Sequence, residues 1–257
     1  MRPAHLCACA PCRLRSFLLA VSLGAVLALP AQAQNAAAPS EQPGELSAIV
    51  QVHAQIVPDA RSAETLGTRR SGTGVVIDDG LVLTIGYLVM EAASIEVTGT
   101  DGRSLPANLV AYDPITGFGL VRPVLALHAK PLPLGDSSAL AVADVALVAT
   151  PNGYSLAQVV SRRTFAGYWE YLLENAIFTA PPRADFGGAA LISKDGKLLG
   201  IGSLIVADAE QPRTRSPGNM FVPVDALKPI LKDLLASGRT TGPARPWLGF
   251  NLAVVED

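Results

Sequence analysis

Four tight-turn signals, each set between two short apolar runs, limit what this chain can fold into. An Asn-Gly or Asp-Gly pair supplies the positive backbone φ angles that a two-residue hairpin turn requires. Each pair therefore predicts an antiparallel hairpin, and repeated hairpins favour an all-β protein, either a sandwich or barrels. The predicted hairpins join 72–77 to 81–84, 94–99 to 104–112, 145–150 to 155–165, and 189–193 to 197–206.

The segment SAIVQVHAQI (47–56) is predicted to be a further strand with one buried face. Its side chains alternate in character, and residues two apart in a strand share a face. One face is apolar, with Ala48, Val50, Val52, Ala54 and Ile56, and the other carries Ile49, Gln51, His53 and Gln55.

One helix is predicted after the last strand. Asp225 can cap it, Pro229 is tolerated near its first turn, and Gly238 ends it. Before the helix, the segment PLPLGDSS (131–138) is predicted to link two β halves, near 47–127 and 140–224. The helix presents an apolar stripe for packing that consists of Leu227, Ile230, Leu231, Leu234 and Leu235.

The N-terminal residues have the three parts of a secretory signal peptide. Arginines precede the apolar run 16–29, and AQA (31–33) is a cleavage site, so cleavage is predicted after Ala33. The run is shorter than the roughly 20 residues that span a bilayer, and an uncleaved anchor is the alternative. Residues 34–46 are rich in Ala, Pro, Gln and Glu and are predicted to be a flexible lead-in.

The composition excludes several classes of function. Cys7, Cys9 and Cys12 all lie in the leader, so the exported chain has no disulfide and no thiol ligand. Two histidines remain, so no metal site is expected, and no glycine-rich phosphate loop opens a helix, so no cofactor is expected. Acidic residues outnumber basic ones by 22 to 20, which argues against nucleic acid as a partner. No later apolar run reaches membrane-spanning length, so no membrane span is expected after signal cleavage.

The order of several segments resembles the Deg/HtrA family of trypsin-like serine proteases. The resemblance covers about residues 47–239 and implies a chymotrypsin/trypsin-like fold: two antiparallel six-stranded β-barrels with the active site between them, and a C-terminal helix. Residues 240–257 resemble the start of the PDZ domain that usually follows in this family, here truncated. The segments are SGTGVVIDDGLVLTIGYLV, AYDPITGFGLV, PLPLGDSSALAVADVALVATPNGY, ADFGGAALISKDGKLLGIGSLI and NMFVPVDALKPILKDLLASGR.

Peptide hydrolysis by this fold needs a serine, a histidine and an aspartate, and the resemblance places other residues at all three positions. Tyr87, in LTIGYLV, stands at the histidine position, where a phenol with a pKa near ~10 keeps its proton at neutral pH. Gly117, in DPITGFGLV, stands at the aspartate position, while Asp113 upstream shapes the turn. Phe186, in ADFGGAAL, stands at the serine position and has no nucleophilic atom. A degenerate triad is therefore predicted.

The resemblance places the remnant of the oxyanion loop at Ala184, Asp185, Gly187 and Gly188. Ala184 replaces the first glycine of that loop, so the backbone donors are not expected to keep their productive arrangement. Loss of the triad in a related mechanism costs on the order of 10⁶ in turnover, which predicts an inactive homologue.

Two features leave alternatives open. His53 on the outer strand face and His128 near the linker are ordinary surface positions, and neither falls beside a Ser or Cys nucleophile motif. The aromatic segment FAGYWEYLL (165–173) could offer a peptide-binding surface, although a core patch followed by a loop is the favoured interpretation.

The sequence therefore predicts an exported protein, periplasmic or secreted, that is a catalytically inactive homologue of a trypsin-like serine protease. It would bind a peptide or a partner protein, with an active protease relative as one candidate partner. The alternative is an active serine-type endopeptidase with a non-standard site, and a third hypothesis is a duplicate with no selected role. Assembly into a trimer is implied by the resemblance alone.

Overall fold

The computed structural model describes residues 44–167 and 171–242. Two short α-helices lie among the described residues, α1 (Ala63–Leu66) and α2 (Leu231–Ser237). The first six strands are β1 (Ile49–Ile56), β2 (Arg69–Asp78), β3 (Leu81–Ile85), β4 (Ala92–Thr98), β5 (Ser104–Tyr112) and β6 (Phe118–Pro123). The later six are β7 (Val145–Thr150), β8 (Gly153–Gly167), β9 (Tyr171–Ala180), β10 (Ala190–Ile192), β11 (Leu198–Val206) and β12 (Gly218–Pro223).

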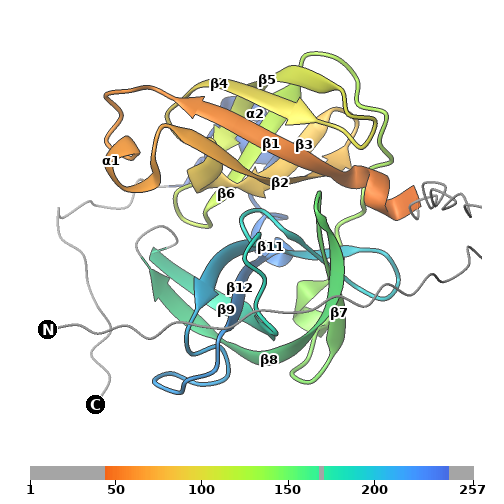
Figure 1. Cartoon of the computed structure of the whole chain (residues 1–257), viewed down its shortest axis with the longest axis vertical. Coiled ribbons are helices and arrows are strands. Elements are labelled where there is room, and N and C mark those ends of the chain that lie inside the picture. Colours follow the sequence, from red (N-terminus) through yellow and green to blue (C-terminus); the bar gives the residue numbers. More distant parts are fainter. Residues whose placement is uncertain (1–43, 168–170, 243–257) are drawn as a thin grey trace, which may run out of the picture. The chain divides into compact units, whose positions relative to one another are not determined.

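The strands close into two antiparallel barrels (Figure 1). The first barrel has the order β1-β2-β3-β6-β5-β4, and the second has the order β10-β11-β12-β9-β8-β7. Both barrels belong to one structural unit. The prediction of an all-β fold built from two antiparallel barrels is thus confirmed.

All four predicted hairpins are present, as the pairs β2–β3, β4–β5, β7–β8 and β10–β11. Gly80 and Gly196 occupy two of the turns with φ angles of 68° and 74°. This left-handed conformation is strained for residues with a side chain, so the turn glycines determine where these strands reverse.

The predicted alternation of β1 is confirmed. Val52 and Ile56 are fully buried in the first barrel, while His53 and Gln55 are exposed on its outer face. Ile49 departs from the pattern, because it is buried although it alternates with the inward residues. The outer face of β1 is therefore polar from Gln51 onward.

The predicted linker 131–138 is hydrogen-bonded to both barrels. The backbone N–H of Leu132 donates to the carbonyl of Val76 in β2 at 2.8 Å, and that of Gly135 donates to Leu198 in β11 at 2.8 Å. The linker thus contributes to holding the two barrels together.

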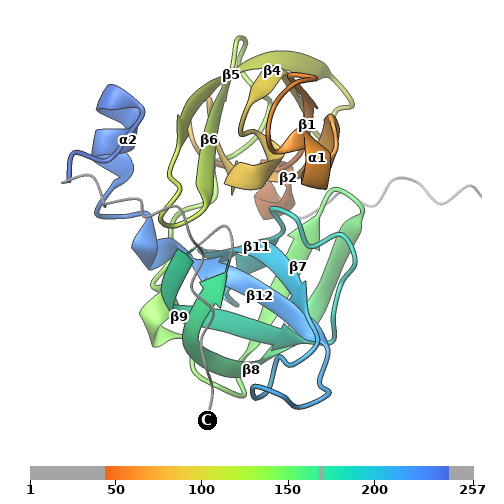
Figure 2. The same cartoon turned by 90° about the vertical axis from the view of Figure 1, so that its left-hand side faces the viewer.

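The C-terminal helix is shorter than predicted. Regular helix begins at Leu231, and Val224–Ala226 forms a separate 3-10 helix. Pro229 lies between the two and has no N–H for a helical hydrogen bond, so one continuous helix does not form. Gly238 ends α2 as predicted, in the left-handed conformation with a φ of 71°. The helix lies beside β5 of the first barrel (Figure 2).

Two details of the predicted helix are wrong. Asp225 does not cap it, because its carboxylate instead accepts the N–H of Ser138 in the linker region at 2.8 Å. Leu235 is not part of the buried stripe, since it is 40% exposed while Leu234 is fully buried.

Several predicted segments fall partly or wholly outside the described residues: the signal peptide (1–33), most of the lead-in (34–46) and most of the tail (240–257). The end of the lead-in is ordered as a 3-10 helix, Gly44–Ala48, in which Leu46 is buried. None of the helices in the described ranges is long and apolar enough to cross a membrane.

The aromatic segment is described only in part, because residues 168–170 are outside the described ranges. Phe165 packs edge-on against Phe178, with ring centroids 6.3 Å apart. Phe178 is fully buried, so Phe165 belongs to the margin of the core.

The turn between β5 and β6 gives a test of the fold. Asp113 is buried, and its Oδ2 accepts hydrogen bonds from the N–H and the hydroxyl of Thr116 at 2.9 Å and 2.6 Å. The substitution Asp113→Ala would leave both donors buried without an acceptor, so we expect the free energy of unfolding to fall by about 1–3 kcal/mol in urea denaturation. Asp113→Asn keeps a hydrogen-bond acceptor, so its free energy of unfolding should fall less than that of Asp113→Ala. The exposed Asp79→Ala should be near neutral, and equal losses in Asp113→Ala and Asp79→Ala would contradict this role.

Candidate functional site

A cleft of about 480 Å³ lies between the two barrels. Its lining includes both the segment after β3 and the loop before β10, which the resemblance had singled out. The first barrel contributes Gln51, His53, Ser71, Gly72, Thr73, Tyr87 and Leu88, and the second contributes Pro151, Asn152, Ala184, Asp185, Phe186 and Gly187.

The structure brings two of the three predicted triad positions to this cleft. Tyr87 lies on the 3-10 helix Gly86–Leu88, and Phe186 lies in the loop before β10. Gly117 does not line the cleft, although its carbonyl accepts the N–H of Gly86 at 2.6 Å. The backbone of Gly117 is therefore hydrogen-bonded to the 3-10 helix that carries Tyr87.

Tyr87 is held at both ends. Its hydroxyl donates across the cleft to the carbonyl of Ser203 in β11 at 2.9 Å, and its own carbonyl accepts from the guanidinium of Arg70 at 2.6 Å. A Cβ atom on Gly187 would lie 3.1 Å from the Tyr87 hydroxyl oxygen, so the two barrels approach closely here. The side chain at the predicted base position thus joins the two barrels.

The loop that precedes β10 is held by its own backbone. The carbonyl of Gly187 accepts the N–H of Thr73 in β2 at 2.8 Å, and the N–H of Gly188 donates to Gly202 in β11 at 2.8 Å. Gly188 has a φ of 77°, and a Cβ atom there would lie 1.9 Å from the carbonyl oxygen of Thr73. Only glycine fits this position without moving β2.

The same loop offers hydrogen-bond donors to a ligand. Across residues 44–167 and 171–242, the N–H groups of Ala184, Asp185, Phe186 and Gly187 have no acceptor. All four residues line the cleft. Successive N–H groups of this kind can bind carbonyl or carboxylate oxygens.

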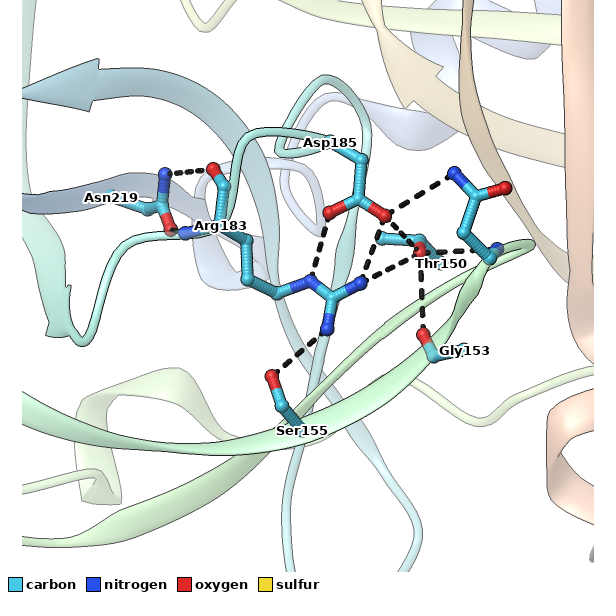
Figure 3. A network of polar contacts seen from close by, with 7 residues as sticks. Thr150, Gly153, Ser155, Arg183, Asp185 and Asn219 are labelled. Carbon is cyan, nitrogen blue, oxygen red and sulfur yellow. Dashed lines mark hydrogen bonds and ion pairs between the residues drawn. The ribbon is translucent and has the colours of Figure 1, made fainter. Parts of the chain in front are cut away.

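Asp185 is anchored by an ion pair that the sequence analysis did not predict (Figure 3). The guanidinium of Arg183 donates to both carboxylate oxygens, at 2.9 Å and 2.8 Å, and Thr150 at the end of β7 donates at 2.6 Å. Asn152 adds a longer bond of 3.4 Å. The hydrogen bonds from Arg183 and, to a smaller extent, from Thr150 outweigh burial and lower the pKa of Asp185 to about 2.

Arg183 extends this network on both sides. Its guanidinium donates to the Ser155 hydroxyl in β8 at 3.0 Å, and its backbone N–H and carbonyl pair with the amide of Asn219 in β12, at 2.7 Å and 3.0 Å (Figure 3). The loop is thereby connected to strands of the second barrel. The Arg-x-Asp spacing was a signal in the sequence, but the partner Thr150 is distant along the chain.

His53 is exposed, as predicted, but it also lines the cleft. Ser71 in β2 is its direct partner across the strands, and Glu96 in β4 is its partner on the other side. The sequence analysis did not anticipate this pairing of His53 with Ser71, and no hydrogen bond joins the two side chains within the described residues. His128, by contrast, is exposed near Asp101 and does not line the cleft.

Comparison with known proteins agrees with this geometry. Residues 72–201 match the family described as "Trypsin-like peptidase domain". The chain is similar to the serine protease PepD of Mycobacterium tuberculosis, with 29% identity over 220 residues that cover 75% of this chain and 47% of the relative. It is also similar to the periplasmic serine endoprotease DegP of Escherichia coli, with 34% identity over 145 residues, 53% of this chain and 30% of the relative.

The chain spans less than half the length of these curated relatives. Among solved structures, it is similar in fold to the HtrA-type protease AlgW with tripeptide, with a TM-score of 0.59 and 20% identity. That match covers 75% of this chain and 62% of the other.

The anchor of Asp185 leads to a pH prediction. Asp185→Asn removes the charged partner of Arg183, and we expect it to lower the free energy of unfolding at neutral pH by about 1–2 kcal/mol. A carboxyl whose pKa is lower in the folded state stabilises the fold above its unfolded pKa and loses that effect as pH falls through the folded pKa. The difference between the two proteins should therefore shrink as pH falls from about 3.8 to about 2.

Urea denaturation over a pH series measures this difference directly. The exposed Asp59→Asn is the matched control and should follow the wild-type curve at every pH. A deficit of Asp185→Asn that stays constant down to the lowest pH would show that the carboxylate charge does not hold the loop.

Proposed function

Because the chain belongs to the family of trypsin-like peptidase domains, with relatives of the Deg/HtrA type, we propose that it is an exported, catalytically inactive member that binds a peptide or partner protein in its cleft. Export is supported by the signal-like N-terminus and by the relatives named as periplasmic. An active protease relative is one candidate partner, and assembly into oligomers is proposed from the resemblance alone.

The proposal of inactivity rests on the side-chain chemistry at the three predicted triad positions, Tyr87, Gly117 and Phe186. A tyrosine hydroxyl that donates to Ser203 cannot accept a proton from a nucleophile while it makes that bond. Phe186 offers no attacking oxygen, and Gly117 has no side chain with which to orient a base. Together these residues lack the nucleophile, the proton acceptor and the orienting carboxylate of the triad.

Binding is supported by what the cleft retains. The four N–H groups of residues 184–187 are available to donate hydrogen bonds to oxygens of a ligand, and Gln51 and Asn152 add polar side chains to the walls. Tyr87, Leu88 and Phe186 provide apolar surface beside them. A cleft lined by uncommitted backbone donors and by apolar side chains suits a peptide in extended conformation.

The cleft can be tested by blocking it. We expect the chain without its predicted signal peptide to leave casein intact and to capture a recurrent partner from its own exported fraction. Asn152→Trp places a bulky side chain at an exposed cleft position and should reduce capture at least about tenfold. Leu156→Trp is the matched control, because Leu156 is 66% exposed on the same hairpin outside the cleft. Casein cleavage, or equal capture by both variants, would contradict the proposal.

A second candidate function is an active serine-type endopeptidase with a non-standard site. The observation in its favour is the row Ser71, His53, Glu96 on three neighbouring strands at the margin of the cleft. Directly opposed residues on antiparallel strands have Cβ atoms about 4.5–5.5 Å apart, close enough for a serine, an imidazole and a carboxylate to interact. The row would place a nucleophile, a base and an orienting group in sequence.

A serine-directed fluorophosphonate probe distinguishes the two candidates. Under the inactive proposal we expect no covalent labelling of the folded protein. Labelling that mass spectrometry assigns to Ser71, and that Ser71→Ala and His53→Ala abolish, would establish the second candidate instead. Ser94→Ala, on the same outer face but opposite Gln55, is the control that should change nothing.

A further inference from the structure

The cleft continues beyond His53 and Ser71 onto the outer face of the first barrel. A second hollow of about 290 Å³ shares both of these residues with the cleft. Its other walls come from β1, β2 and β4, which lie side by side in the sheet (Figure 1). The residues that line only the second hollow are Ala54, Gln55, Arg69, Arg70, Ser94 and Glu96.

The strand register gives this surface a direction. Gln51 pairs with Thr73 at the cleft, His53 pairs with Ser71 at the shared margin, and Gln55 pairs with Arg69 at the far end. The two hollows therefore follow one another along β1 and β2. An extended chain rises about 3.3 Å per residue, so the four steps from Thr73 to Arg69 correspond to roughly 13 Å.

Arg69 differs from its neighbour Arg70 in what it is free to bind. Arg70 is buried, and its guanidinium donates to Ser62, Gly67 and Tyr87. Burial lowers the pKa of Arg70, and the charge of Glu91 opposes that effect. The side chain of Arg69 is exposed and makes no ion pair or hydrogen bond with any residue that the structure describes.

Glu96 faces the hollow from the opposite side. Its carboxylate accepts the hydroxyl of Ser104 at 3.2 Å, and it lies beside His53 rather than beside Arg69. The hollow thus has an uncommitted cation on β2 and a partly committed anion on β4. A guanidinium binds a carboxylate with two parallel hydrogen bonds, a geometry that a lysine or a neutral donor does not offer.

We propose that the cleft binds an extended peptide that continues along β1 and β2 and places an acidic side chain on Arg69. The acidic residue lies about four residues along the peptide from the residue that contacts Gly187, since Gly187 is hydrogen-bonded to Thr73. This inference rests on the proposed peptide-binding function and adds to it a chemical class of ligand and a residue that selects it.

The test uses a display library of random dodecapeptides selected on residues 34–257, the chain without its predicted signal peptide. Selected peptides that bind the wild type but not the Asn152→Trp variant are those that occupy the cleft. We expect an acidic residue to be enriched at one position of these peptides. In fluorescence anisotropy, Arg69→Glu should weaken the binding of the synthetic peptides about two- to fivefold, the range for an ion pair at an exposed site.

Two controls make the result specific. Arg122→Glu changes the same charge at an exposed position on β6 that lines neither hollow, and it should leave affinity unchanged. A peptide with the selected acid replaced by lysine should bind Arg69→Glu better than it binds the wild type.

The outcomes separate the two claims. The role of Arg69 would be overturned if the cleft peptides showed no enrichment of acidic residues, or if Arg69→Glu left their affinity unchanged. Either result would leave the proposed function intact. If every selected peptide binds the Asn152→Trp variant as well as the wild type, no peptide occupies the cleft. Both the inference and the proposed peptide binding are then wrong.

Discussion

The close backbone contact between β2 and the loop before β10 is the constraint on which the site depends. Thr73 donates its N–H to Gly187, and a side chain on Gly188 would collide with the carbonyl of Thr73 at 1.9 Å. A Cβ atom on Gly202 would likewise lie 2.1 Å from the carbonyl oxygen of Phe186. These glycines allow the loop to lie between the barrels, and any larger residue would move the loop or separate the strands.

Because the backbone holds this loop, the side chains that face the cleft are less constrained. The carbonyl of Phe186 accepts the N–H of Ala189, but its ring is not part of any such bond. Asp185 and Arg183 attach the loop to β7 through Thr150. The loop that carries Phe186 is thus held by interactions that do not involve the Phe186 side chain. Fold and catalysis can therefore be lost separately, and similarity of fold alone does not establish activity.

The sequence predicted what local chemistry determines. Each Asp-Gly or Asn-Gly turn and the alternation of β1 depend on residues close together in the chain, and these predictions held. The start of α2 was missed because the apolar stripe continues through Pro229, and the pattern alone does not show that the proline separates two helices. The pairing of His53 with Ser71 was missed because register depends on the segment between the strands, which includes the unpredicted α1. The anchor of Asp185 on Thr150 needs the closed barrel and has no local signal.

The residues at the three predicted triad positions differ in how much they contribute to the stability of the fold. At Phe186, a serine would remove no hydrogen bond that the structure describes, since only the backbone carbonyl of Phe186 is bonded. At Tyr87, a histidine would remove the hydroxyl that donates to Ser203 and with it a bond between the barrels. At Gly117, the φ of 79° disfavours any side chain, by roughly 1–2 kcal/mol for most residues and less for aspartate. Building a triad at the three predicted positions would therefore cost stability at two of them before any proton could be transferred. A single substitution toward a triad would have no catalytic advantage, because each triad residue works only with the others.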